Sequence, residues 1–174
     1  MRGGAGAQFV NDVEGELGDV PFVVTRIDDE LSDLADVDHL AVAGHSSGAI
    51  VAFGNAFGAC CDDERVDAVL IEALPVPPDG ENAAEIKTTP VMFIHGDADL
   101  IPPAVSHAAF EEAEPPKYFL TIPGGDHSDA YRSGPSAPLV AEAALAFFDL
   151  HLKGRDEALD GLKALPTVEA VPTG

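Results

Sequence analysis

The pentapeptide GHSSG at positions 44–48 is the feature that most constrains the fold of this chain. It matches G-x-S-x-G, a sharp turn that joins a strand to a helix and projects a serine hydroxyl. The flanking residues fit this reading, because Leu40–Ala43 is a short apolar run of strand type and Ala49–Phe53 begins a helix-compatible run. The two outer glycines let neighbouring backbone approach closely. The sequence therefore predicts a strand–turn–helix unit with Ser46 at its apex.

Two further motifs follow in a fixed order. HGDAD at positions 95–99 comes after the apolar run Val91–Ile94, and PGGDH at 123–127 comes after Tyr118–Ile122. A serine hydroxyl becomes a good nucleophile when an adjacent base removes its proton. The order serine, acid, histidine is one of several chain orders that give the same triad geometry. We therefore expect Ser46 to act as nucleophile and His127 as general base.

The three motifs together resemble the α/β-hydrolase superfamily over nearly the whole chain after about Asp12. In that superfamily the acid segment commonly reads H-G-x-x-D, followed by apolar residues and a proline. The resemblance thus implies Asp99 as the triad acid, and Asp97 is the alternative, expected to brace the turn through its own side chain. The backbone N–H of Ser47, in the first helical turn, is expected to form half of the oxyanion hole.

Several segments are most similar to the bacterial branch that contains dienelactone hydrolases, cutinase-like polyester hydrolases and related small esterases. They are Asp19-Val20, GHSSG, HGDADLIPP, PGGDH and the closing FFDLHLKG. The resemblance implies hydrolysis of small-molecule or polymeric carboxylic esters or lactones through an acyl-enzyme on Ser46, without a cofactor. Acyl transfer or C–C bond hydrolysis with the same triad remains an alternative. Another is a truncated remnant or interaction module without catalysis.

The remaining histidines are expected to be structural or solvated: His39, His45, His95, His107 and His151. A metal site is the competing chemistry, and its ligands would come from His95, Asp97, Asp99, His107, Asp126 and His127. No spacing among these residues matches a recognised pattern such as H-E-x-x-H or a paired C-x-x-C. We therefore expect no metal.

Helices and strands alternate along the chain, which predicts a parallel sheet covered by helices on both faces. An apolar stripe from Val20 to Leu34 predicts an amphipathic helix with Asp19 as N-cap and Pro21 near its first turn. We expect strands over 40–43, 66–74, 91–95 and 118–122, and further helices over 47–57, 103–112, 140–151 and 156–165, with a loop over 75–80. Gly154 is expected to end the helix over 140–151.

These four strands are only part of the sheet that the resemblance implies, since about half of the superfamily's strands precede the nucleophile. We therefore expect residues 1–174 to form a single, incomplete α/β-hydrolase domain that lacks its N-terminal strands. Leu40–Ala43 would then be an exposed apolar edge that invites self-association. The second oxyanion donor, which the superfamily supplies from an earlier loop, would also be missing, and losing one donor costs about 10²–10³ in rate.

The formal net charge is −22, from 31 acidic and 9 basic residues. Such a surface repels nucleic acid and anionic membranes, so neither is an expected partner. No run approaches the ~18 apolar residues of a membrane span, and the first residues lack a signal-type apolar segment. We expect a soluble protein, cytoplasmic by default, although a missing N-terminus would leave room for a signal. Adjacent Cys60 and Cys61 are expected to be free thiols.

Overall fold

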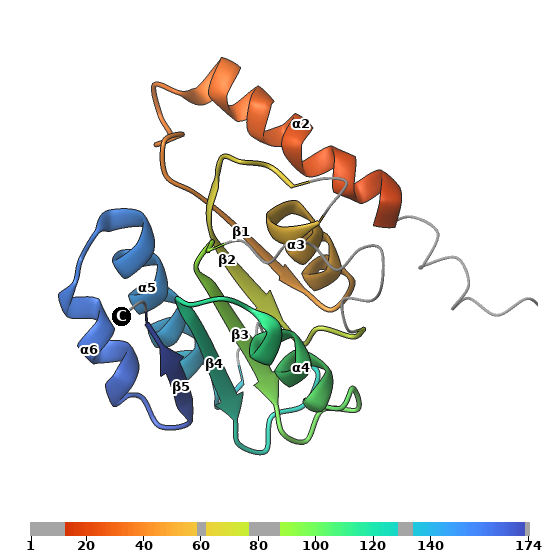
Figure 1. Cartoon of the computed structure of the whole chain (residues 1–174), viewed down its shortest axis with the longest axis vertical. Helices are drawn as coiled ribbons and strands as arrows, with labels where there is room; N and C mark the ends of the chain where they lie inside the picture. Colours follow the sequence, from red (N-terminus) through yellow and green to blue (C-terminus); the bar gives the residue numbers. More distant parts are fainter. Residues whose placement is uncertain (1–12, 59–61, 77–87, 129–133, 173–174) are drawn as a thin grey trace, which may run out of the picture.

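The computed structural model describes residues 13–58, 62–76, 88–128 and 134–172. These residues form a mixed five-stranded sheet with helices on both faces, which confirms the predicted α/β class (Figure 1). The expectations for Cys60, Cys61 and most of the loop over 75–80 lie outside the described residues. None of the described helices is both long and apolar enough to cross a bilayer.

The sheet has the order β1-β2-β3-β4-β5. Four strands run parallel and correspond to the predicted ones: β1 (Leu40–His45), β2 (Val66–Glu72), β3 (Val91–Gly96) and β4 (Lys117–Ile122). Their carboxyl ends therefore meet at one edge of the sheet. The register places His45 opposite Glu72, and His95 opposite Thr121. All three sequence motifs lie at this edge.

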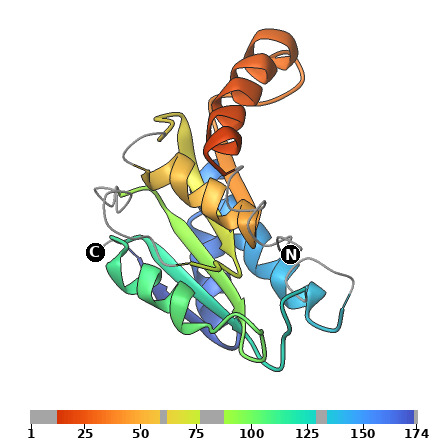
Figure 2. The ribbon, with the colours of Figure 1, turned by 90° about the vertical axis from the view of Figure 1, so that its right-hand side faces the viewer.

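Two apolar cores lie between the sheet and the helices that cover its two faces. Helices α3 (Ser47–Phe57) and α4 (Ala104–Glu112) cover one face, with Phe93, Phe110 and Phe119 fully buried between them and the strands. Helices α5 (Ala137–Lys153) and α6 (Glu157–Ala164) cover the other face (Figure 2). Every residue of β3 is buried, as expected for a central parallel strand packed on both faces. The centre of the sheet is thus completely covered by the helices on its two faces.

The C-terminal segment departs from the prediction. Helix α6 is followed by a fifth strand, β5 (Val168–Val171), which pairs antiparallel with β4. The helix expected over 156–165 is therefore confirmed as α6, but the strand that follows it was not predicted. The four residues VEAV carry too short a pattern to signal a strand, and they are ordered by pairing with β4.

The N-terminal helix also differs from the prediction. Helix α2 spans Val13–Leu31, so Asp19 lies inside it and cannot be its N-cap, and Pro21 is internal. Leu34 lies beyond the helix end and is 86% exposed. Proline is often read as a helix start, yet an interior proline is tolerated at some cost when packing holds the helix. Here Leu17 packs closely over Gly54 of α3, before the predicted start.

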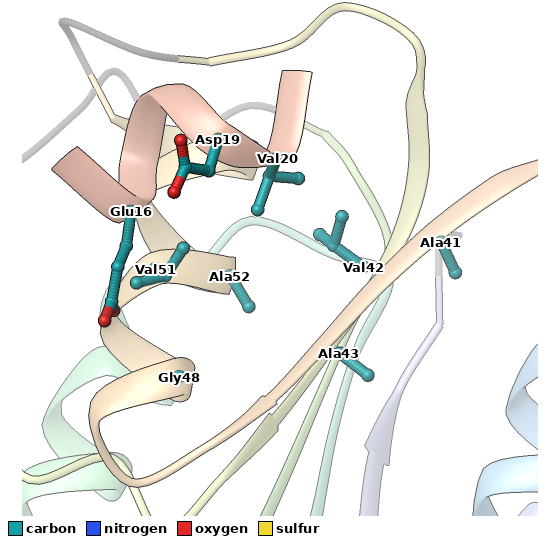
Figure 3. A pocket seen from close by; sticks show the side chains of 9 residues that line it. All are labelled: Glu16, Asp19, Val20, Ala41, Val42, Ala43, Gly48, Val51 and Ala52. Carbon is teal, nitrogen blue, oxygen red and sulfur yellow. The ribbon is translucent and has the colours of Figure 1, made fainter. Parts of the chain in front are cut away.

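Strand β1 lies at an edge of the described sheet, as predicted. Helix α2 packs against α3 and overhangs this edge, which leaves a groove of about 450 Å³ (Figure 3). Val20 of α2, Val42 of β1 and Val51 of α3 supply apolar lining from three sides, and the carboxylate residues Glu16 and Asp19 line the groove as well. Ala43 is exposed in the middle of the strand. The strand that leads to Ser46 is therefore the least covered of the parallel strands.

Candidate active site

Ser46 stands at a strained turn between β1 and α3. Its φ of 55° and ψ of −117° are sparsely populated for a residue with a side chain, and such strain often marks functional positions. The Ser46 N–H donates to the carbonyl of Glu72 on β2 over 3.0 Å, which ties the turn to the sheet. The side chain thereby projects from the carboxyl edge of the sheet.

The two outer glycines of this turn differ in whether a side chain would fit at their positions. A Cβ on Gly44 would lie 1.9 Å from the carbonyl oxygen of Gly48, so no side chain fits there. A Cβ on Gly48 itself would meet nothing within 4 Å. Close backbone approach therefore requires glycine at position 44. The expectation that position 48 also needs glycine for this reason is wrong, because a side chain would fit there.

A second glycine contact joins the other two motifs. A Cβ on Gly96 would lie 2.2 Å from the carbonyl oxygen of Gly125, so the loops after β3 and β4 touch through their backbones. The Ala98 N–H donates to the same Gly125 carbonyl over 3.0 Å. This approach holds the acid-bearing loop against the histidine-bearing loop.

The structure brings together all three predicted triad residues. The Nδ1 atom of His127 lies 2.9 Å from Oδ2 and 3.1 Å from Oδ1 of Asp99, and Nε2 lies 3.0 Å from Oγ of Ser46. Since a carboxylate only accepts hydrogen bonds, Nδ1 donates and Nε2 is left to accept from the Ser46 hydroxyl. The Asp99 side chain is fully buried, while that of His127 is 25% exposed. The arrangement can transfer a proton from Ser46 to a base whose orientation is fixed.

Asp97 takes the bracing position expected for it. Its Oδ1 accepts a hydrogen bond of 2.6 Å from the Gly124 N–H, and its own N–H donates to the Ile122 carbonyl. Asp99 instead contacts His127 and accepts from the Ile101 N–H over 2.8 Å. The geometry thus favours Asp99 over Asp97 as the partner of His127.

Ser47 and His45 flank the candidate nucleophile. Ser47 is the first residue of α3, so its N–H belongs to the helix turn whose donors lack intrahelical acceptors. The Nε2 of His45 donates to the His127 carbonyl over 2.6 Å, and the two rings lie 4.8 Å apart. Burial lowers the pKa of His45. His45 therefore holds the histidine loop in place as a neutral side chain.

The other histidines make local contacts. His39 pairs with Asp36 at the surface, and His107 stacks on Phe119 with ring centroids 4.1 Å apart. His151 lies 3.1 Å from the Tyr118 hydroxyl, and burial lowers the pKa of His151 to about 4 and raises that of Tyr118 to about 12. Across the described residues, no group of three or more His, Cys, Asp or Glu side chains is placed to hold a metal ion.

Sequence reasoning missed two features next to the triad. His95 is fully buried, with Nδ1 2.7 Å from the Ser106 hydroxyl and Nε2 3.3 Å from Oδ2 of Asp99. Its position in the HGDAD motif was visible, but Ser106 comes from α4 and has no local signal. The second feature is Glu72, at the end of β2 opposite His45, where burial raises the carboxyl pKa to about 6.

No family model matches the chain. A curated relative, the uncharacterized protein YfhR of Salmonella typhimurium, is 37% identical over 75 residues, which cover 42% of this chain and 25% of the relative. YfhR of Salmonella typhi shows the same identity and coverage. The match thus spans about a quarter of the length of these relatives, and their names state no activity. It carries no functional assignment to this chain.

Proposed function

We propose that this protein is a serine hydrolase that cleaves carboxylic esters or lactones. The observation that supports this most is the hydrogen-bonded line from Ser46 through His127 to buried Asp99, with contacts of 3.0 and 2.9 Å. The resemblance of the three motifs to the α/β-hydrolase superfamily, in its dienelactone hydrolase and cutinase-like branch, points to the same chemistry. The substrate is a small-molecule or polymeric ester.

Acylation begins when the Ser46 oxygen attacks the ester carbonyl carbon and its proton passes to Nε2 of His127. Buried Asp99 accepts from Nδ1–H, keeps the ring in the productive tautomer and stabilises the imidazolium that forms. The Ser47 N–H donates to the developing oxyanion. Collapse of the tetrahedral intermediate breaks the bond to the alcohol oxygen, which takes the proton from His127 and leaves.

Deacylation repeats these steps with water as nucleophile. His127 accepts a proton from the water as it attacks the acyl carbon, and the Ser46 oxygen recovers that proton when it departs. The acid product is released and the triad returns to its first state. Every proton is carried by Nε2 of His127, whose side chain is 25% exposed.

A fluorophosphonate probe together with 4-nitrophenyl acetate hydrolysis tests the proposal. Both covalent labelling and hydrolysis should be lost in Ser46→Ala. Ser47→Ala is the matched control, because it removes a neighbouring hydroxyl and keeps the backbone N–H. Labelling that persists in Ser46→Ala would overturn the assignment of the nucleophile.

Two alternatives have distinct outcomes in the same assays. Acyl transfer with this triad would give Ser46 labelling and preferential passage of the acyl group to an added alcohol over water. A non-catalytic interaction module would give a folded chain with neither labelling nor hydrolysis. The interaction module is the stronger of these two alternatives, because β1 is an edge strand of the described sheet and has a groove beside it.

A further inference from the structure

The buried pair of His95 and Ser106 has no role in the proton transfers described above. His95 follows Ile94 near the end of β3, and Ser106 lies in the first turns of α4. Both side chains are fully buried. The Nδ1 of His95 is 2.7 Å from the Ser106 hydroxyl, and its Nε2 is 3.0 Å from the carbonyl of Ile101. A polar pair placed so deeply is costly unless its hydrogen bonds are satisfied.

These contacts determine where the His95 proton lies. The Ile101 carbonyl only accepts, so Nε2 carries the hydrogen and donates to it. Nδ1 is then an acceptor, and the Ser106 hydroxyl donates to it. Burial lowers the pKa of His95, in keeping with a neutral ring. The nearby titratable groups are Asp99 in the following loop, His127 in the loop after β4 and His107 on α4.

His95 contacts the acid-bearing loop at two points. Nε2 lies 3.3 Å from Oδ2 of Asp99, the oxygen that also receives His127 Nδ1–H. Ile101, whose carbonyl accepts from His95, returns its own N–H to Oδ1 of Asp99. The ring thus holds the turn whose backbone orients the carboxylate, and its N–H dipole lies beside that carboxylate.

We propose that His95, held as the Nε2–H tautomer by the Ile101 carbonyl, is a positioning residue for Asp99. This inference rests on the proposed hydrolase function. In the opposite tautomer, an unprotonated Nε2 would face both the Ile101 carbonyl and the Asp99 carboxylate, and repulsion would loosen the turn. The Ile101 carbonyl and the Asp99 carboxylate therefore fix the proton on Nε2, and the Ser106 hydroxyl donates to the lone pair left on Nδ1. The chain of contacts then runs from α4 through His95, Asp99 and His127 to Ser46.

His95→Leu tests the proposal, with His95→Gln as the matched variant that keeps an N–H donor near Nε2. With ¹⁵N-labelled histidine, His95 of the unmodified protein should show the Nε2–H tautomer at neutral pH. Ser106→Ala should keep that tautomer, because the Ile101 carbonyl still accepts from Nε2–H. In 4-nitrophenyl acetate hydrolysis, kcat of His95→Leu should fall about tenfold with KM unchanged, because the substrate does not touch this buried ring.

The pH profile of kcat/KM distinguishes a positioning role of His95 from a loss of packing, because a loss of packing would not shift it. Without the Nε2–H dipole beside it, Asp99 attracts protonated His127 more strongly, so the acidic limb of kcat/KM should move to higher pH. A shift of roughly half to one pH unit corresponds to one net hydrogen bond. His95→Gln should retain more kcat than His95→Leu and a profile closer to that of the unmodified protein. Ser106→Ala, which keeps the Nε2–H donor, should leave the acidic limb in place. If His95→Leu does not fold, His95→Asn, whose amide ends near the position of Nδ1, takes its place.

An Nδ1–H tautomer in the unmodified protein would overturn the proposal. So would a folded His95→Leu variant whose kcat and acidic limb match those of the unmodified protein. Failure of the hydrolase function has a different result, because Ser46-dependent hydrolysis is then absent from the unmodified protein. In that event the low-field proton of His127 Nδ1–H still reports on Asp99, and an unchanged resonance in His95→Leu would reject the positioning role.

Discussion

Two regions of the molecule differ sharply in how well they are buried. The first is the carboxyl ends of β3 and β4, and the second is the side of β1 that faces α2. At the first, the side chains of His95, Asp99 and Ser106 are fully buried in a connected set of hydrogen bonds. At the second, β1 pairs with no further strand among the described residues and lies beside a groove, and Phe22 of α2 is 65% exposed. The proposed acid and base, Asp99 and His127, thus follow two well-buried strands.

Ser46 belongs to the second region. Among the described residues, its strand, β1, pairs on one side only, with β2. The proposed triad therefore joins a fully buried region to a less covered one. Local opening is favoured where few apolar contacts oppose it, so the position of Ser46 is the one of the three that the fold secures least.

The largest expected effect is at the well-supported end of the triad. Asp99→Asn should reduce kcat for 4-nitrophenyl acetate by about 10⁴, because the amide favours the wrong tautomer of His127. Asp97→Asn is the matched control and should cost far less, since Asp97 contacts the Gly124 N–H and not His127. A reversed ranking would move the acid to Asp97.

The contrast in burial should appear directly in stability. Phe93 in β3 is fully buried and Phe22 in α2 is 65% exposed, so the same substitution removes very different contacts. Phe93→Ala should lower the free energy of unfolding by about 3–5 kcal/mol, whereas Phe22→Ala should change it by about 0.5 kcal/mol or less. Urea titration followed by circular dichroism measures both. A large loss in Phe22→Ala would show that α2 is better packed, or covered by another copy of the chain.

The free edge of β1 is expected to support self-association. Ala43→Lys places a charge on this exposed edge and should weaken any dimer at least tenfold, as lysine does on natural edge strands. Leu145→Lys is the control, because Leu145 is 63% exposed on α5 and the change in charge is identical. Sedimentation velocity over a range of concentrations measures both variants. Equal effects, or a strictly monomeric parent protein, would remove this edge as an interface.

The smallest effect concerns Glu72, at the junction of the two regions. Burial raises its carboxyl pKa from an ordinary 4.5 to about 6, so the folded state binds this proton more tightly than the unfolded state. Ionisation of Glu72 therefore lowers stability as the pH rises from 4.5 through 6, and the cost is fully present above that range. Glu72→Gln should add about 1 kcal/mol at pH 7, after allowance for partial exposure, and little at pH 4. Thermal unfolding at both pH values measures this, and an equal gain at both would exclude ionisation as the cause.

The sequence was a good guide to the strands and helices that follow local rules. Apolar runs such as Val91–Ile94 predicted the central strands, and Gly154, in the left-handed region at φ 61°, ends α5 as expected. The start of α2 was missed because Pro21 suggested a helix N-terminus that packing on α3 overrides. β5 was missed because its order depends on pairing with β4.

The sequence by itself identified Ser46, Asp99 and His127 as candidates, because a strained turn, an acid after a strand and a glycine-rich histidine loop each leave a local pattern. Their convergence at one sheet edge follows from the parallel order of β1, β3 and β4. Only the tertiary structure decided that His95 and Ser106 support Asp99, and that Ala43 is exposed where β1 has its free edge. Those outcomes depend on which elements pack together, and contacts between residues distant in the chain leave no periodic or motif signal in a single sequence.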